Sequence, residues 1–170
     1  MNKISIHNNP EKLAYLIGAL RDGCFIRNDS NHIYRIKIYQ KNKEWIEILD
    51  SIIQELFGKK STISLDVRDS VWNLMVNSKI VYQKLVEYSD FPGSQKVWNT
   101  PKFVLNSDLE VQKSYVRGFF DSEGGVPHIE ERKIKPKDIR VEFTQVNKKC
   151  LEEGSRYHSG RREGGSNSRL

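Results

Sequence analysis

One stretch decides the fold of this chain: Tyr115-Val116-Arg117-Gly118-Phe119-Phe120-Asp121-Ser122-Glu123-Gly124-Gly125. It predicts an apolar helix with one small residue inside it, ending in a carboxylate followed by two glycines. A weaker copy near the N-terminus reads Leu13-Ala14-Tyr15-Leu16-Ile17-Gly18-Ala19-Leu20-Arg21-Asp22-Gly23. The two copies predict two related units, and we expect their opening helices to lie side by side and to bring Asp22 and Glu123 together.

Small residues mark the expected contact between these two helices. Ala14 and Gly18 are four positions apart, so they share one face of the first helix and form a groove that another backbone can approach. Gly118 is the small residue inside the second helix. We therefore expect these three residues at the helix interface.

Hydrophobic periodicity predicts a first unit over residues 1–90 with the order helix, strand, strand, helix, strand, strand, helix. The expected elements are a helix to about residue 22, strands at 24–27 and 33–40, a helix at 43–57, strands at 60–67 and 71–77, and a helix at 79–88. Residues 91–106 begin with a Pro- and Gly-containing stretch that predicts a linker. A second unit follows over 107–153, with a helix to Glu123 and a strand at 139–146.

The second unit repeats the letters of the first. Tyr34 to Lys43 matches Ile139 to Lys148 at a constant offset. The repeat predicts an α+β fold of two αββαββα units, whose antiparallel sheets form one saddle about a pseudo-twofold axis between the motif helices. The repeat stops after residue 153, so we expect the second unit to be incomplete.

Residues 154–170 are rich in Gly, Ser and Arg and have no apolar period, which predicts disorder. Two interpretations of this tail are open. It is either a basic arm that contacts DNA phosphates or the product of a truncated or frameshifted second half.

The composition favours a nucleic-acid partner and excludes several classes of protein. The 170 residues carry a net charge of +6 and a pI of about 9.3, which suits a polyanion, although mild basicity also serves solubility. Two cysteines make neither a disulfide framework nor a zinc site, so we expect a cytoplasmic protein. No apolar run reaches the roughly 18 residues of a membrane span, so no membrane partner is expected.

The two carboxylates are electrostatically costly where they stand. The helix dipole disfavours an anion at a helix C-terminus by roughly 0.3–1 kcal/mol, and two adjacent carboxylates also repel each other. A divalent cation relieves both costs and suits phosphodiester hydrolysis. Oxygen ligands favour Mg²⁺ (or Mn²⁺), so Asp22 and Glu123 are candidate metal ligands; the alternative is that both are solvated helix-end residues.

These residues carry a resemblance to a known family. Val116 to Gly124 resembles the nine-residue motif of the LAGLIDADG homing endonucleases, with Gly118, Asp121, Ser122, Glu123 and Gly124 in register. The first motif is one residue shorter, and Arg21 stands where an acid is common. The resemblance implies that the motif helices pack across the pseudo-twofold axis, that Asp22 and Glu123 are metal-binding catalytic acids, and that the saddle lies in the DNA major groove.

The family also places polar and basic residues near the scissile phosphates, at the end of the second strand of each unit. By this resemblance the further catalytic candidates are Gln40 and Lys41 in the first unit and Gln145 in the second. Val146 stands where the first unit has Lys41, which removes one cation. From the residues alone, Lys41 and Lys43 are an ordinary solvated helix start.

The polar face of the predicted sheet supplies candidate contacts to double-stranded DNA. An antiparallel ribbon fits the major groove, where Arg and Lys reach guanine edges or phosphates. The candidates are Arg27, Arg35, Lys37, Tyr39, Thr62, Ser64, Arg68 and Arg140.

The sequence therefore predicts a metal-dependent, site-specific DNA endonuclease of the homing type, intron-encoded or independent, that acts as a monomer. Two alternatives stay open. One is a DNA- or RNA-binding module without cleavage, such as an intron maturase with the same fold. The other is a non-functional remnant that associates with itself to cover its open side.

Overall fold

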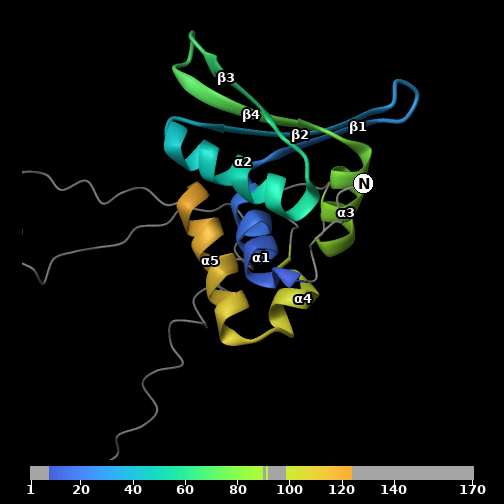
Figure 1. The fold of residues 1–170 in the computed structure, drawn as a ribbon, viewed down its shortest axis with the longest axis vertical. Coiled ribbons are helices and arrows are strands. Elements are labelled where there is room, and N and C mark those ends of the chain that lie inside the picture. The colour runs from blue at the N-terminus through green and yellow to red at the C-terminus, as the bar shows by residue number, and fades with distance from the viewer. Residues whose placement is uncertain (1–7, 90, 92–98, 124–170) are drawn as a thin grey trace, which may run out of the picture.

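Five helices and one sheet make up the part of the chain that the computed structural model describes, residues 8–89, 91 and 99–123 (Figure 1). The helices are α1 (Pro10–Ala19), α2 (Lys43–Phe57), α3 (Lys79–Tyr88), α4 (Lys102–Leu105) and α5 (Leu109–Glu123), and a 3-10 turn, η2 (Leu20–Asp22), follows α1. The strands are β1 (Cys24–Asn28), β2 (Ile33–Gln40), β3 (Thr62–Asp66) and β4 (Val71–Asn77). None of these helices is long and apolar enough to span a membrane.

The predicted order of helices and strands is confirmed for the first unit and for the opening helix of the second. The strand expected at 139–146 and the tail 154–170 lie outside the described residues. The α+β class is therefore confirmed on the first unit and α5.

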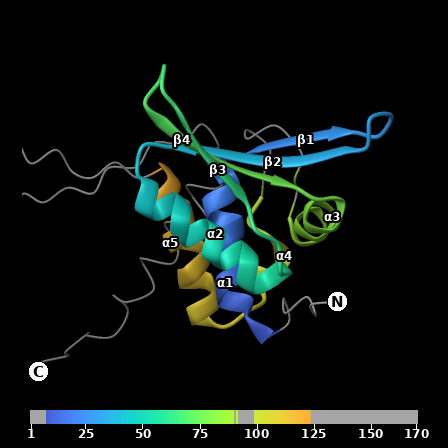
Figure 2. The same cartoon turned by 45° about the horizontal axis from the view of Figure 1, so that its top comes forward.

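The four strands form one antiparallel sheet in the order β1-β2-β4-β3. In β2, Tyr34, Ile36 and Ile38 are buried, as alternation with period two predicts. The helices lie on the side of the sheet that these residues face (Figures 1 and 2). Within the described chain, the opposite face of the sheet is open.

Helix α2 begins and ends where the sequence indicates. The Asn42 side chain accepts a hydrogen bond from the Trp45 backbone N–H at 3.1 Å, which caps the first turn. Gly58 has a φ of 62°, and its N–H donates to the Gln54 carbonyl at 2.8 Å, which ends the helix. The buried stripe of α2 comprises Trp45, Ile46, Leu49, Asp50, Ile53, Leu56 and Phe57.

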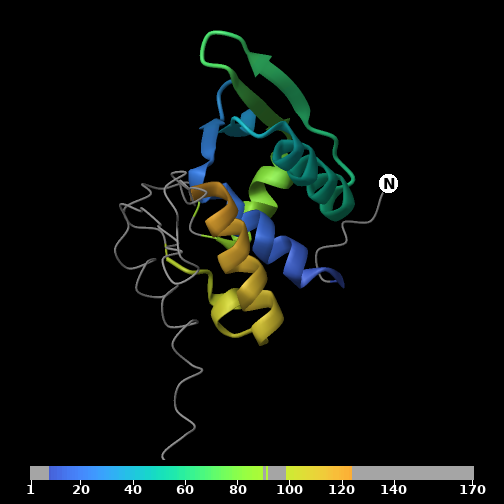
Figure 3. The same ribbon diagram turned by 90° about the vertical axis from the view of Figure 1, so that its left-hand side faces the viewer.

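Helices α1 and α5 pack directly against each other through their backbones (Figure 3). A Cβ atom added to Gly118 would lie 2.0 Å from the Tyr15 carbonyl oxygen, and one added to Gly18 would lie 2.2 Å from the Tyr115 carbonyl oxygen. Both distances are far below any real Cβ contact, so only glycine fits at either position. Ala14, the third residue expected at the interface, is buried within α1.

Residues 91–106 differ from the expected linker. The four-residue helix α4 lies within this segment, and Phe91 and Val104 join the hydrophobic core. A helix of one turn is too short to show a 3.6-residue period, and the neighbouring prolines and glycine obscure it. The segment therefore packs as part of the domain at both of its described ends.

Gly23 ends the first helix with an extended backbone, a φ of −84° and a ψ of 157°, and its N–H donates to the Leu20 carbonyl oxygen at 2.8 Å. One further detail concerns the edge of the sheet. In the β3–β4 hairpin, Leu65 and Val67 are 45% and 78% exposed, although they alternate with polar residues. The hairpin extends beyond the helices that cover the rest of the sheet (Figure 1).

The helix contact predicts a sharp stability difference between two positions of α5. Gly118→Ala should lower the free energy of unfolding by about 2 kcal/mol or more, because overpacking against backbone outweighs the roughly 1 kcal/mol gain in helix propensity. Lys113→Ala, on the exposed side of the same helix, should change it by less than about 0.5 kcal/mol. Urea unfolding of the two variants measures both values, and similar losses would contradict the contact.

Candidate functional site

The candidate site lies where the two motif helices end. Helices α1 and α5 run in the same direction, with their C-terminal ends toward the sheet (Figure 1). Asp22 is the last residue of η2, and Glu123 is the last residue of α5. Because η2 also packs against α5, the chain brings these two ends together.

The 3-10 turn η2 compensates for the missing residue of the first motif. Asp22 follows Gly18 by four residues, whereas Glu123 follows Gly118 by five. A residue advances about 1.5 Å in an α-helix and about 2.0 Å in a 3-10 helix. One α-helical step and three 3-10 steps from Gly18 advance about 7.5 Å, and so do five α-helical steps from Gly118. Ideal helix geometry therefore predicts that the Cα atoms of Asp22 and Glu123 lie about equally far along their helices from the glycine contact.

Two tyrosines at equivalent positions connect the helices on either side of that contact. Tyr15 stands three residues before Gly18, and its hydroxyl donates to Asp121 Oδ2 at 2.8 Å. Tyr115 stands three residues before Gly118, and its hydroxyl accepts from Arg21 Nε at 3.0 Å. Asp121 and Arg21 each stand three residues after a glycine. The two halves thus share one geometry, with an anion in one half and a cation in the other.

Arg21 is a structural residue, which explains why the first motif departs from the family pattern. Its side chain is 1% exposed. Arg21 Nη2 donates to the Asn99 carbonyl oxygen, and the guanidinium carbon lies 5.5 Å from the centroid of the Phe91 ring. Arg21 therefore holds the described ends of residues 91–106 against the helix pair. The sequence showed Arg21 only as an unusual residue in a motif.

Tyr15 also contacts α2. Trp45 Nε1 donates to the Tyr15 hydroxyl at 3.0 Å, so the phenol accepts one hydrogen bond and donates another to Asp121. Burial, followed by the hydrogen bond to Asp121, raises the pKa of Tyr15 to about 12. Trp45 belongs to the buried stripe of α2, and the sequence gave no sign of this polar contact.

The donor chemistry of the two helix ends fits a hard divalent ion. An aspartate and a glutamate at these two ends would offer carboxylate oxygens to such an ion, whereas Asp121 already accepts from Tyr15 and lies 3.7 Å from Arg117 Nε. Among the side chains that the structure describes, no group of three or more His, Cys, Asp or Glu residues is arranged to hold a metal ion.

The junction between β2 and α2 carries the other catalytic candidates of the first unit. Gln40 Oε1 accepts from the Lys41 backbone N–H at 2.8 Å, and Lys41 is exposed. Lys43 Nζ lies 3.0 Å from Glu47 Oε1 and 5.2 Å from the centroid of the Trp72 ring. The Lys43 side chain is therefore held by contacts within the protein. No ion pair of Lys41 is found within the described residues. Gln145 and Val146 lie outside those residues.

The open face of the sheet collects five of the predicted DNA contacts. Strand register places Lys37 beside Met75, and Met75 beside Thr62. It likewise places Tyr39 beside Asn73, and Asn73 beside Ser64. The five are Arg35, Lys37, Tyr39, Thr62 and Ser64, and the sequence prediction missed Asn73, Met75 and Asn77 between them. In β4, Asn73, Met75 and Asn77 alternate with Trp72, Leu74 and Val76, and this alternation could have predicted that they share the open face.

Arg27 does not share this open face. It pairs with Tyr34, so its side chain lies on the helix side of the sheet, and its guanidinium forms an ion pair with Asp29 at 2.8 Å. Hydrogen bonds from Arg27 and Tyr34 lower the pKa of Asp29. Arg68 lies at the exposed β3–β4 turn, 3.6 Å from Asp66. Arg140 lies outside the described residues.

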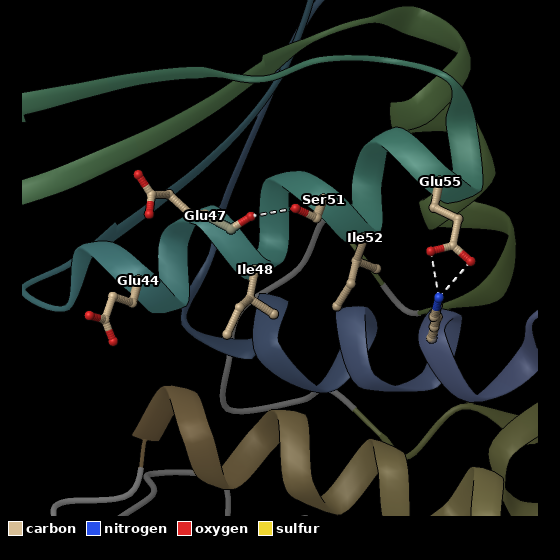
Figure 4. A pocket seen from close by; sticks show the side chains of 7 residues that line it. Glu44, Glu47, Ile48, Ser51, Ile52 and Glu55 are labelled. Atoms are coloured by element: carbon tan, nitrogen blue, oxygen red, sulfur yellow. Dashed lines mark hydrogen bonds and ion pairs between the residues drawn. The ribbon is translucent and has the colours of Figure 1, made fainter.

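A groove on the outer side of α2 gathers none of the candidate site residues (Figure 4). Its volume is about 400 Å³, and Lys12 closes one end through its contact with Glu55 at 2.6 Å. The remaining lining residues are Glu44, Glu47, Ile48, Ser51 and Ile52. The groove is therefore separate from the helix ends and from the open sheet face.

The chain is similar in sequence to known proteins. No family model matches the chain. Over 118 residues it is 32% identical to the homing endonuclease I-ApeI of Aeropyrum pernix, covering 67% of this chain and 52% of the relative. It is 27% identical to an uncharacterized protein of Methanocaldococcus jannaschii over 129 residues, 74% of this chain and 46% of the relative. The chain spans about half the length of these curated relatives.

Solved structures show the same fold. A crystal structure of I-DmoI in complex with DNA and Mn matches with a TM-score of 0.57 and 22% identity, over 87% of this chain and 76% of that chain. Mesophilic variants of the homing endonuclease I-DmoI match with a TM-score of 0.61 and 22% identity, over 88% and 76%. The resemblance to the homing endonucleases and the fold that it implied are confirmed.

The raised pKa of Tyr15 predicts a loss of stability at high pH. The phenol titrates near pH 10.0 in an unfolded chain and near 12 in the folded protein. Between these values the unfolded state loses a proton that the folded state keeps, so the free energy of unfolding falls as pH rises. The wild type should lose about 1–2 kcal/mol more than Tyr15→Phe, a value reduced for solvent screening of a half-buried group.

Urea unfolding at a series of pH values up to 12 measures this difference. Tyr34 and Tyr82 also have raised pKa values, mainly through a hydrogen bond to Asp29 and through burial, respectively. Both tyrosines remain in the two proteins, so their contributions cancel. An equal loss in wild type and Tyr15→Phe would contradict the assignment.

Proposed function

We propose, from the homing-endonuclease fold, that this chain is a site-specific DNA endonuclease that hydrolyses phosphodiester bonds in double-stranded DNA with Mg²⁺ or Mn²⁺. The observation that carries the proposal is the glycine contact, which sets the ends of η2 and α5 side by side near an open polar sheet face. Sequence similarity to I-ApeI over half of that protein, and the fold of I-DmoI in complex with DNA and Mn, support it.

Asp22 and Glu123 are the residues that would hold the divalent ion. When bound, such an ion lowers the pKa of water and stabilises charge on a leaving oxygen. The two carboxylates would supply oxygen ligands. The bound divalent ion would offset their unfavourable placement at helix C-termini, which costs about 0.3–1 kcal/mol for each carboxylate. DNA phosphates would complete the ligand set, so the site is assembled only on its substrate.

The β2–α2 junction would supply polar groups near the phosphate. Lys41 is exposed at this junction and would offset negative charge that develops on the phosphate oxygens. The side-chain oxygen of Gln40, Oε1, accepts a hydrogen bond from the Lys41 backbone N–H. This leaves the side-chain NH₂ group of Gln40 as a donor. Gln145 would take the corresponding place in the second unit by the internal repeat.

The open sheet face would bind the major groove. Lys37 and Arg35 supply positive charge for phosphates or guanine edges, and Tyr39, Thr62 and Ser64 supply hydroxyl groups. Both motif helices come from one chain, which favours action as a monomer.

A binding module without cleavage is the second candidate function. The favouring observation is Arg21, a buried cation directly before Asp22, in the half of the helix pair whose counterpart carries Asp121. A fixed positive charge beside a carboxylate weakens its attraction for a metal ion. Such a protein would bind DNA or structured RNA, as an intron maturase does, and would leave both strands intact.

Cleavage of a randomised double-stranded DNA library with Mg²⁺ tests the first function. The wild type should cut a narrow set of sequences. Glu123→Gln should reduce the rate by about a thousandfold or more, because it removes an anionic metal ligand. Glu110→Gln, in the exposed first turn of the same helix, should cut at the wild-type rate. Tight binding with no cleavage at any sequence would instead support the binding module.

DNA affinity should separate two cations on opposite faces of the sheet. Lys37→Ala should weaken binding about tenfold and reduce the slope of log affinity against log salt by about 0.9, as expected for one lost phosphate contact. Arg27→Ala, which removes the same charge from the helix side, should weaken binding by less than about twofold because Asp29 already pairs with it. Equal effects from a salt titration would contradict the proposed DNA face.

A further inference from the structure

A short polar relay crosses three helices below the helix ends. Trp45 Nε1 of α2 donates to the Tyr15 hydroxyl of α1 at 3.0 Å, and that hydroxyl donates to Asp121 Oδ2 of α5 at 2.8 Å. The three residues are far apart in sequence, 30 positions between Trp45 and Tyr15 and 106 between Tyr15 and Asp121. The relay therefore couples elements that chain connectivity alone would not hold together.

The two ends of the relay lie next to the two parts of the candidate site. At one end, the Trp45 backbone N–H donates to Asn42, and Asn42 directly follows Lys41. At the other end, Asp121 stands two residues before Glu123 in the last turn of α5. The path from the β2–α2 junction to the end of α5 thus runs through a single hydroxyl group.

We propose that Tyr15 is a positioning residue, whose hydroxyl fixes the last turn of α5 relative to the β2–α2 junction. The role of these two parts in catalysis rests on the proposed function, whereas the contact itself does not. Tyr15 touches neither candidate acid through any described contact, so it acts through Asp121 and Trp45.

The bonds of the relay are suited to this task. The last carbonyl groups of a helix have no partner within the helix, so a final turn frays unless something holds it. A hydrogen bond from a phenol to a carboxylate is charge-assisted and stronger than a neutral one. The second neighbour of Asp121, Arg117, lies 3.7 Å away and is 78% exposed, so it is the weaker restraint.

Packing of the Tyr15 ring is the competing explanation, and Tyr15→Phe separates the two because it keeps the ring. In the full 170-residue chain without metal or DNA, the variant should speed amide hydrogen exchange at residues 119–123 about tenfold. Exchange in α3, which the relay does not reach, should stay unchanged.

Tyr82→Phe is the matched control. Tyr82 is 2% exposed, and its hydroxyl has no hydrogen-bond partner among the described residues. Removal of that hydroxyl should leave exchange at 119–123 at the wild-type rate. Equal acceleration in both variants, or none in Tyr15→Phe, would overturn the proposal.

A second readout tests the consequence for the site. On a cleaved DNA target, Tyr15→Phe should raise the half-saturating Mn²⁺ concentration about fivefold to tenfold and leave KM for DNA unchanged, because the sheet face is intact. A merely structural loss would lower the fraction of active protein without moving the Mn²⁺ midpoint, and that result would overturn the positioning role.

Asp121→Asn keeps the test decisive if Tyr15→Phe does not fold. The amide retains an acceptor oxygen for the Tyr15 hydroxyl and loses the charge, so exchange at 119–123 should lie between wild type and Asp121→Ala. If the wild type cleaves no DNA but exchange responds as expected, the contact stands and the nuclease assignment fails. If the wild type cleaves and neither exchange nor the Mn²⁺ midpoint moves, the Tyr15 inference alone fails.

Discussion

The structure depends on one close approach between two helix backbones. Gly18 meets the Tyr115 carbonyl and Gly118 meets the Tyr15 carbonyl, so each glycine fits against the backbone three residues before the other. A contact that is reciprocal in this way fixes the positions of both helices along their axes. Ideal helix rises then predict that the Cα atoms of Asp22 and Glu123 lie about equally far beyond the contact, since the 3-10 turn makes up the difference in residue number. The remaining helices and the sheet are built around this pair.

The helix pair is symmetric in geometry and asymmetric in chemistry. Tyr15 and Tyr115 reach across the contact in the same way, but one meets a carboxylate and the other meets a buried guanidinium. The guanidinium of Arg21 also contacts Phe91 and Asn99. In the first half, a residue that packs the core therefore stands where the motif commonly has an acid. The two helix ends are therefore chemically distinct, even though the backbone presents them as equivalents.

Sequence patterns predicted the elements and the helix interface because those features depend on local periods and on small residues at fixed spacing. The same patterns could not predict features that join distant positions. Burial of Arg21 needs Asn99, which stands 78 residues later, and the relay needs Asp121, which stands 106 residues after Tyr15. Arg27 was predicted on the open face because the bounds of two strands do not show which residues pair across the sheet. Its pairing with Tyr34 places Arg27 on the helix side.

The glycine contact also acts as a pivot. Two helices that approach most closely at one contact can change their crossing angle by rotating about it. The segments from the glycines to the helix ends are about 7.5 Å long. A rotation of about 10° moves the end of such a segment by about 1.3 Å, which is enough to misalign reacting groups about a hundredfold in rate. Tyr15 and Tyr115 lie before the glycine contact, and their hydroxyl groups form hydrogen bonds with residues three positions after it. Their hydrogen bonds to Asp121 and Arg21 oppose such a rotation.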